Sequence, residues 1–276
     1  MNRPDPVATD PSALTPGQRL CLADYDLLPA REPAWRYLVL SPQRTGSNYL
    51  CRRLCNVRGR FGMPSEYLNP AAVRLLAPRL LPGCQPDSVP FATYMQAVQR
   101  VRTSADGCFG LKLQPAQLSA VAAGDRALFE FAASFDRIVA LSRRDKLGQA
   151  ISGTIAQLTG TWFNDGTPPA LEDKRLSQLF PAIAANLSRY VEEDRRIAAL
   201  GKALDRPWLR LEYEDIVADG QSVFETLVDF LSGGGCDPLD EAPDVQVPER
   251  PSTEVAERLR ARFLDYINGQ STGTGS

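Results

Sequence analysis

The chain contains no histidine among its 276 residues. This absence excludes Ser-His-Asp and Cys-His catalysis, and it excludes any histidine-ligated metal site built from this chain alone. A general base must therefore come from Glu, Asp, Lys, Tyr or Cys.

Long apolar runs and blocks of one charge are also missing. No apolar run reaches the roughly 18 residues of a membrane span, and the formal net charge is only −2. The N-terminus lacks a basic start followed by an apolar stretch, so we expect no signal peptide. We predict a cytoplasmic protein with no membrane span and no nucleic-acid partner.

The six cysteines are scattered and contain no CxxC pair. Cys51 and Cys55 lie one helical turn apart, but no second pair completes a set of metal ligands. We interpret the cysteines as small buried thiols in a reducing compartment.

Short apolar runs alternate with helix-like stretches along the chain. The runs typical of strands are 36–41, 108–113, 137–142 and 207–212. The helix-like stretches are 47–58, 70–80, 90–102, 116–133, 145–160, 174–204, 222–232 and 252–267. This alternation predicts an α/β protein whose mostly parallel sheet is covered by helices on both faces.

We expect one domain over residues 18–268, which is an ordinary length for an α/β domain. Residues 1–17 are rich in Pro, Asp and Thr and predict a flexible N-terminus, while 269–276 predict a flexible tail. The segment 163–173 interrupts the helices, as either a solvent-exposed loop or a lid over a substrate.

The most informative segment runs from Trp35 to Leu50. An apolar run ends in a turn with Arg44 and Gly46, and a helix-like stretch follows at once. Such a turn favours an anion, because free N–H groups and the positive end of the helix dipole point into it. The alternative is an ordinary βα connection with Ser47 as the helix N-cap. The segment is neither a Walker A nor a G-x-G-x-x-G motif.

Two further segments accompany this turn. They are Gly62–Leu68, with the pattern G-x-P-x-E-Y, and Arg143–Ser152, with R-R-D-K-x-x-Q-A-x-S. The order of R-T-G-S and these two patterns resembles the Stf0-type bacterial sulfotransferases, whose best-known member sulfates trehalose. The resemblance covers about residues 36–165. It implies a P-loop-like three-layer α/β/α fold and 3′-phosphoadenosine 5′-phosphosulfate (PAPS) as cofactor, with adenosine 3′,5′-bisphosphate (PAP) as product. It also implies a homodimer.

The resemblance assigns cofactor roles to two groups of residues. The 5′ phosphosulfate would be held by Arg44, Thr45, Gly46, Ser47 and Asn48. Arg44 would also stabilise charge on the bridging oxygen, unless it forms a surface salt bridge. Arg143 and Ser152 would hold the 3′ phosphate, with Arg144 as a rival. The alternative is a charged strand end followed by a capping Asp145.

The resemblance assigns the general base to Glu66, in the G-x-P-x-E-Y pattern. A carboxylate can act in this way when burial or neighbours raise its pKa toward neutrality. The alternative is a loop carboxylate that caps a helix. Lys112 resembles the lysine of the family's G-x-K-[LM] segment, where it would touch the transferring sulfonate or form a structural ion pair. Trp162 is a candidate for stacking on adenine or for a place in the core.

Two later segments carry weaker signals. Tyr213-Glu214-Asp215 is common among sulfotransferases, and we interpret it as mainly structural. Arg250 is a candidate contact for the cofactor phosphate, but the family pattern is interrupted after it by Pro251-Ser252-Thr253.

We therefore predict a PAPS-dependent sulfotransferase that modifies a hydroxyl group of a small polar acceptor, such as a carbohydrate or glycoconjugate. In-line attack would use the Glu base, and no metal is expected, because cations and backbone dipoles can stabilise the charge. The alternatives are an ATP-dependent phosphotransferase and a non-catalytic PAP-binding protein.

Overall fold

The computed structural model describes residues 14–57, 59–84, 88–119, 124–160, 176–234 and 254–272. Its four strands form one sheet in the order β2-β1-β3-β4, and each pairing is parallel. The strands are β1 (Trp35–Leu40), β2 (Cys108–Leu113), β3 (Arg137–Ser142) and β4 (Trp208–Glu212). Each predicted strand agrees to within one residue at its ends, which confirms the predicted α/β class.

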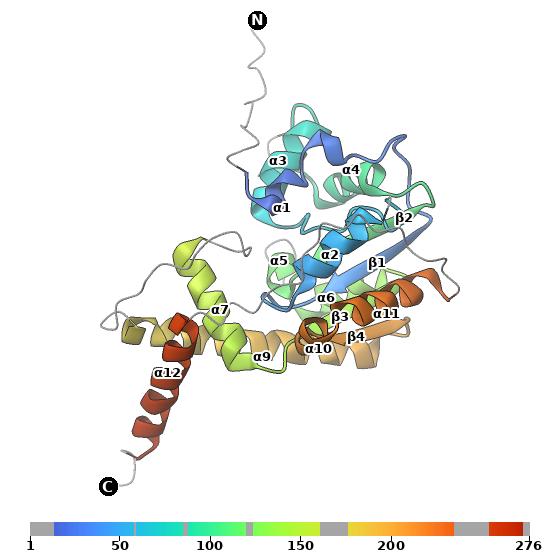
Figure 1. The fold of residues 1–276 in the computed structure, drawn as a ribbon. Coiled ribbons are helices and arrows are strands. Elements are labelled where there is room, and N and C mark those ends of the chain that lie inside the picture. The colour runs from blue at the N-terminus through green and yellow to red at the C-terminus, as the bar shows by residue number, and fades with distance from the viewer. Residues whose placement is uncertain are drawn as a thin grey trace, which may run out of the picture.

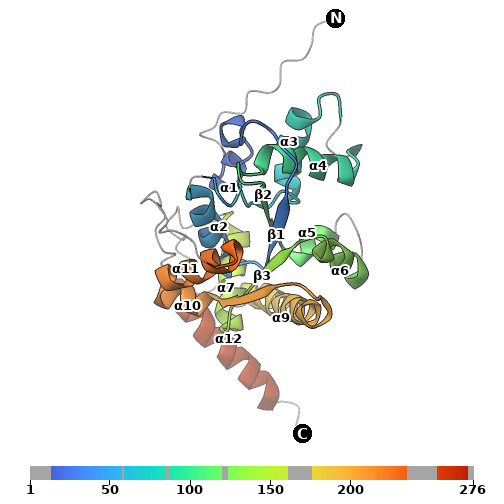
Figure 2. The ribbon, with the colours of Figure 1, turned by 90° about the vertical axis from the view of Figure 1, so that its right-hand side faces the viewer.

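Helices cover both faces of the sheet, as Figure 2 shows. Neighbouring residues of β1 point to opposite faces: Tyr37 and Val39 pack in one apolar cluster, Leu38 and Leu40 in another. The first cluster includes α2 (Ser47–Asn56) and α11 (Gly220–Ser232). The second includes α3 (Pro70–Leu80), α4 (Phe91–Arg102), α6 (Asp125–Ala133) and α9 (Phe180–Ala203). The fold is thus a P-loop-like three-layer α/β/α arrangement.

A third apolar cluster joins α9 to α7 (Lys146–Thr159) and α12 (Glu254–Thr272). Ile151, Tyr190 and Phe263 are buried there, one from each helix. Figure 1 shows α12 projecting away from the sheet beyond α7 and α9. This packing fixes α7, which follows β3 after the turn 143–145, against two other helices.

The prediction of one helix over 116–133 is wrong. The chain forms α5 (Pro115–Ser119) and then α6, which begins at Asp125 after Gly124. Gly124 has a φ of 96°, a left-handed conformation that an α-helix cannot include. Three short elements were not predicted: α1 (Pro16–Arg19), a 3₁₀ turn (Ala23–Tyr25) and α10 (Tyr213–Ala218).

Two helices extend across the predicted domain boundaries at residues 18 and 268. Leu14 is buried, and α1 begins at Pro16. Helix α12 continues past residue 268 to Thr272. The rest of both predicted flexible ends, 1–13 and 273–276, lies outside the described residues.

The sheet order brings three strand ends to one edge. Strand β1 lies between β2 and β3, so the carboxyl ends of all three strands are neighbours. Ligands of open α/β sheets bind at this edge, where the strand order reverses. In the described part of the chain, no helix combines the length and apolar character needed to cross a membrane.

Candidate active site

The loop between β1 and α2 has two residues in the left-handed region. Arg44 has a φ of 64° and Gly46 a φ of 78°. Gly46 is the N-cap residue of α2 and Ser47 is the first helical residue, so the alternative of Ser47 as N-cap is wrong. The N-cap makes no side-chain hydrogen bond to the first turn of α2. The start of α2 therefore keeps the backbone donors that suit an anion.

Packing against α10 holds this loop in place. A Cβ atom on Gly46 would lie 3.2 Å from side-chain carbons of both Tyr213 and Ile216. Thr45 is fully buried, and its hydroxyl donates a hydrogen bond of 3.1 Å to the carbonyl oxygen of Pro42. The loop is therefore preorganised by sterics and by an internal hydrogen bond.

Arg44 and Ser152 are in direct contact, although they lie 108 residues apart in sequence. The Nε of Arg44 donates to the Oγ of Ser152 at 2.9 Å. Burial is the main cause that lowers the pKa of Arg44, and the nearby charge of Arg143 lowers it further. The structure thus brings together the residues predicted to hold the two phosphate ends of the cofactor.

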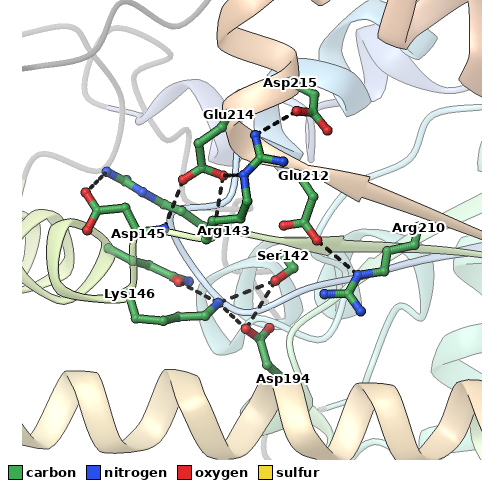
Figure 3. A network of polar contacts seen from close by, with 11 residues as sticks. Ser142, Arg143, Asp145, Lys146, Asp194, Arg210, Glu212, Glu214 and Asp215 are labelled. Carbon is green, nitrogen blue, oxygen red and sulfur yellow. Dashed lines mark hydrogen bonds and ion pairs between the residues drawn. The ribbon is translucent and has the colours of Figure 1, made fainter.

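Arg143 and Arg144, in the turn after β3, have different surroundings; Figure 3 labels Arg143. The Arg143 guanidinium stacks on the Tyr213 ring at 4.4 Å, and its side chain is 14% exposed. The Arg144 side chain is 58% exposed, and it pairs with Asp215 at 2.8 Å. Of the two arginines, it is Arg143 whose charge lowers the pKa of Arg44.

Glu214 holds the same turn through backbone hydrogen bonds. The N–H groups of Arg144 and Asp145 each donate to Glu214 at 3.0 Å (Figure 3). Burial raises the pKa of Glu214, but these N–H donors outweigh it, so the pKa is lowered. Asp145 in turn caps α7 by accepting from Gly148 at 2.9 Å, and Arg260 of α12 also donates to it. These contacts agree with a structural role for Glu214.

Glu66 and Lys112 form an ion pair of 2.5 Å at the carboxyl end of β2. The backbone places them together, because the N–H of Lys112 donates to the carbonyl of Ser65 at 3.1 Å. The Nζ of Lys112 also donates to Oδ1 of Asn48, in the first turn of α2. Lys112 therefore connects the candidate base to the turn Arg44–Asn48, the candidate anion loop.

Three amide side chains complete the surroundings of the Glu66 carboxylate. Gln114 donates to Oε1 at 3.0 Å, while Gln117 and Asn69 donate to Oε2 at 2.7 and 3.2 Å. Burial raises the pKa of Glu66, but Lys112 and the amide donors outweigh burial, so the pKa is lowered. The requirement of a raised pKa is thus not met in this state, where Glu66 is an ionised carboxylate.

Sequence reasoning missed the amide residues of the site. Gln114 directly follows β2 and Gln117 lies in α5 just beyond it, and polar residues three apart at the carboxyl end of a strand are a usable signal. Gln43 was also missed: its carbonyl oxygen accepts from Gln149 of α7 at 2.6 Å. No comparable signal marks Asn69, which is the N-cap residue of α3.

Other predicted residues lie outside the described residues. They are Arg250, Trp162 and the segment 163–173. Among the residues that the structure does describe, no group of three or more potential metal ligands is found.

The fold and the site together define a P-loop-like α/β protein. At the carboxyl edge of its sheet it carries a helix start whose backbone donors suit an anion, clustered arginines and a lysine–carboxylate pair. The family model described as Stf0 sulphotransferase matches residues 36–262, and the chain belongs to this family. Membership identifies the protein as a transferase of the sulfotransferase class.

Other comparisons add little to this assignment. A comparison with curated proteins finds no match. Among solved structures, the sulfotransferase domain from the Synechococcus PCC 7002 olefin synthase is similar, with 19% sequence identity and a TM-score of 0.46. The similarity covers 84% of this chain and 90% of that chain. The family assignment rests on the match of the family model.

Proposed function

We propose that the protein transfers a sulfuryl group from PAPS to a hydroxyl group of a small polar acceptor. A carbohydrate or glycoconjugate fits this description. The observation that carries the proposal is the position of Lys112, which bonds both to Asn48 of the anion loop and to Glu66. A cofactor anion at the start of α2 and a base at Glu66 would therefore share one lysine.

The residues of the anion loop fit a phosphosulfate group. The Oγ of fully buried Ser41 has no hydrogen-bond partner among the described residues, and the start of α2 lacks a side-chain cap. An anion with several acceptor oxygens would supply partners for such donors. We assign its binding to Arg44, Thr45, Gly46, Ser47 and Asn48.

We assign the 3′ phosphate to Arg143 and Ser152. Arg143 is largely buried and close to Arg44, whereas Arg144 is paired with Asp215 on the exposed side of the turn. This difference favours Arg143 over Arg144. We retain Arg250 as a proposed contact on the basis of sequence.

When bound, PAPS supplies the sulfuryl group, and the side chains at the site handle the charges. Glu66 would accept the proton of the acceptor hydroxyl group, and Arg44 would stabilise charge on the leaving phosphate. Lys112 would stabilise charge at the sulfonate oxygens. A lysine shared with an anion holds Glu66 less strongly, so the pKa of Glu66 would rise toward the range of a useful base. The cationic side chains make a metal unnecessary in this mechanism.

We also propose a cytoplasmic location and a homodimer. Within the described residues the cysteines are free thiols, namely Cys21, Cys51, Cys55, Cys84 and Cys108. Free thiols agree with a reducing compartment. The dimer is inferred from the family, and sedimentation of the purified protein would test it.

Thermal stabilisation by PAP tests the cofactor assignment, with ATP and NADP as controls. A ligand at about 100 times its dissociation constant adds roughly 2.7 kcal/mol to the stability of the folded state. We expect PAP to raise the melting temperature of the wild type and not that of Arg143→Ala. The absence of a shift with PAP would reject the proposal, and a shift with ATP alone would favour a phosphotransferase.

A further inference from the structure

The two oxygens of the Glu66 carboxylate have different kinds of donor. Oε2 accepts from the amide groups of Asn69 and Gln117, at 3.2 and 2.7 Å. Oε1 accepts from the Lys112 ammonium and from Gln114, the latter at 3.0 Å. The ionised carboxylate therefore accepts hydrogen bonds from four donors. One donor must give way before the carboxylate can take a proton from a substrate.

The two donors at Oε2 are fixed by the backbone. The Oδ1 of Asn69 caps α3 by accepting from the N–H of Ala71 at 3.0 Å. The Oε1 of Gln117 accepts from the N–H of Gln114 at 3.1 Å. A side-chain amide has its oxygen on one side and its NH₂ on the other. Because both amide oxygens face backbone N–H groups, both NH₂ groups must face Glu66.

The Lys112 donor at Oε1 is less constrained. The Nζ of Lys112 has a second acceptor in Asn48, at the start of α2. An ammonium group carries three N–H bonds on a flexible stem, so it can exchange one acceptor for another without moving the backbone. Any anion bound next to Asn48 would compete for Lys112 and would weaken its bond to Oε1.

We propose that Asn69 and Gln117 are positioning residues that anchor Oε2 of Glu66, leaving Oε1 as the oxygen that accepts the proton. This inference rests on the proposed role of Glu66 as general base. In the transfer step the acceptor O–H bond breaks, the proton binds Oε1, and the electron pair stays on the acceptor oxygen. That oxygen forms the new bond to sulfur, and the electron pair of the old S–O bond leaves on the 5′ phosphate.

Anchoring of one oxygen has two measurable consequences. A donor to the ionised form lowers the pKa of the carboxylate, so removal of Gln117 should raise it. The anchor also fixes the direction of Oε1, so its removal should slow proton transfer without affecting the binding of the cofactor. A merely structural side chain would have neither effect.

The test compares Gln117→Leu with the wild type and with Gln157→Leu. Gln157 serves as a control, because its exposed amide on α7 bonds to Asn186 of α9 and not to Glu66. Each protein is labelled with ¹³C at the glutamate carboxyl carbons and titrated by NMR, and the Glu66 signal is assigned by its loss in Glu66→Gln. We expect Gln117→Leu to raise the Glu66 pKa by about one unit, equivalent to about 1.4 kcal/mol, and Gln157→Leu to leave it unchanged.

Asn69→Ser provides a second variant that does not depend on the folding of the first. Serine is a good N-cap and keeps the start of α3, but it lacks the amide donor to Oε2. We expect the same upward shift of the Glu66 pKa. In turnover assays, both variants should lower kcat at least tenfold with little change in the KM for PAPS, and the acid limb of kcat/KM should move to higher pH.

An unchanged Glu66 pKa in both Gln117→Leu and Asn69→Ser would overturn the inference, as would a fall in kcat equal to that of Gln157→Leu. The NMR titration needs no turnover. Failure of the wild type to bind PAP would therefore reject the proposed function separately from the anchoring of Glu66.

Discussion

Replacement of Lys112 by Met should convert the paired carboxylate of Glu66 into an uncompensated charge. The Lys112 side chain is 4% exposed and that of Glu66 is 21% exposed. Loss of one partner of a buried ion pair costs about 3–5 kcal/mol. Because Glu66 keeps its three amide donors and some contact with solvent, we expect the lower end, about 3 kcal/mol at pH 8.

The pH dependence of this loss follows from the pKa of Glu66. In the wild type this pKa is lowered from its ordinary value of 4.5. Glu66 therefore stabilises the fold above that value, and the stabilisation is lost as the pH falls through the lowered pKa. In Lys112→Met, burial acts without the opposing cation and raises the pKa. The destabilisation of the variant should then be largest at high pH and should become smaller as Glu66 becomes protonated.

Urea denaturation at pH 8 and pH 5 measures both effects. Lys112→Met should be less destabilised at pH 5 than at pH 8. The double variant Lys112→Met/Glu66→Gln should be more stable than Lys112→Met at pH 8, because it no longer buries a charge. Equal destabilisation at the two pH values, or a double variant weaker than Lys112→Met, would refute the assignment of an ionised, lysine-dependent Glu66.

Three further predictions concern other parts of the molecule. Arg143→Ala should abolish thermal stabilisation by PAP, while Arg144→Ala should retain most of it. Gly46→Ala should destabilise the protein by about 1–2 kcal/mol in urea denaturation, because its φ of 78° is left-handed. Burial raises the pKa of Glu193 to about 7, so the wild type should lose stability as the pH rises from 4.5 to 7. Glu193→Gln should remove this loss and be about 3 kcal/mol more stable than the wild type at pH 8.5, but only about 1 kcal/mol more stable at pH 5, when unfolding is measured against pH.

The strands and most helices could be predicted from the sequence because their residues have simple environments. Each strand is an apolar run in a sheet covered on both faces. A strand of this kind can be predicted from its own residues, without knowledge of the strands that pair with it. The break between α5 and α6 was missed because residues on both sides of Gly124 favour a helix. There a single left-handed residue outweighed the surrounding propensity.

The site was predicted only in part, for a geometric reason. Parallel strands bring the Arg44 turn and the Arg143 turn to one edge, so their proximity follows from topology alone. The donors around Glu66 come from residues 46 and 51 positions away, at Lys112 and Gln117. Their meeting depends on the register between Ser65 and Leu111, which no local pattern encodes. The direction of the Glu66 pKa shift depends on the same contacts.

Release of PAP from PAPS, measured with a panel of carbohydrate acceptors, tests the central claim most directly. The wild type should form PAP and a sulfated acceptor in equal amounts. Glu66→Gln should lose roughly 10²–10⁴-fold in turnover, the usual contribution of a general base, while PAP still stabilises it. Turnover by Glu66→Gln at the wild-type rate would contradict the role of Glu66. A wild type that binds PAP but transfers sulfate to no acceptor would contradict the proposed enzyme and indicate a non-catalytic PAP-binding protein.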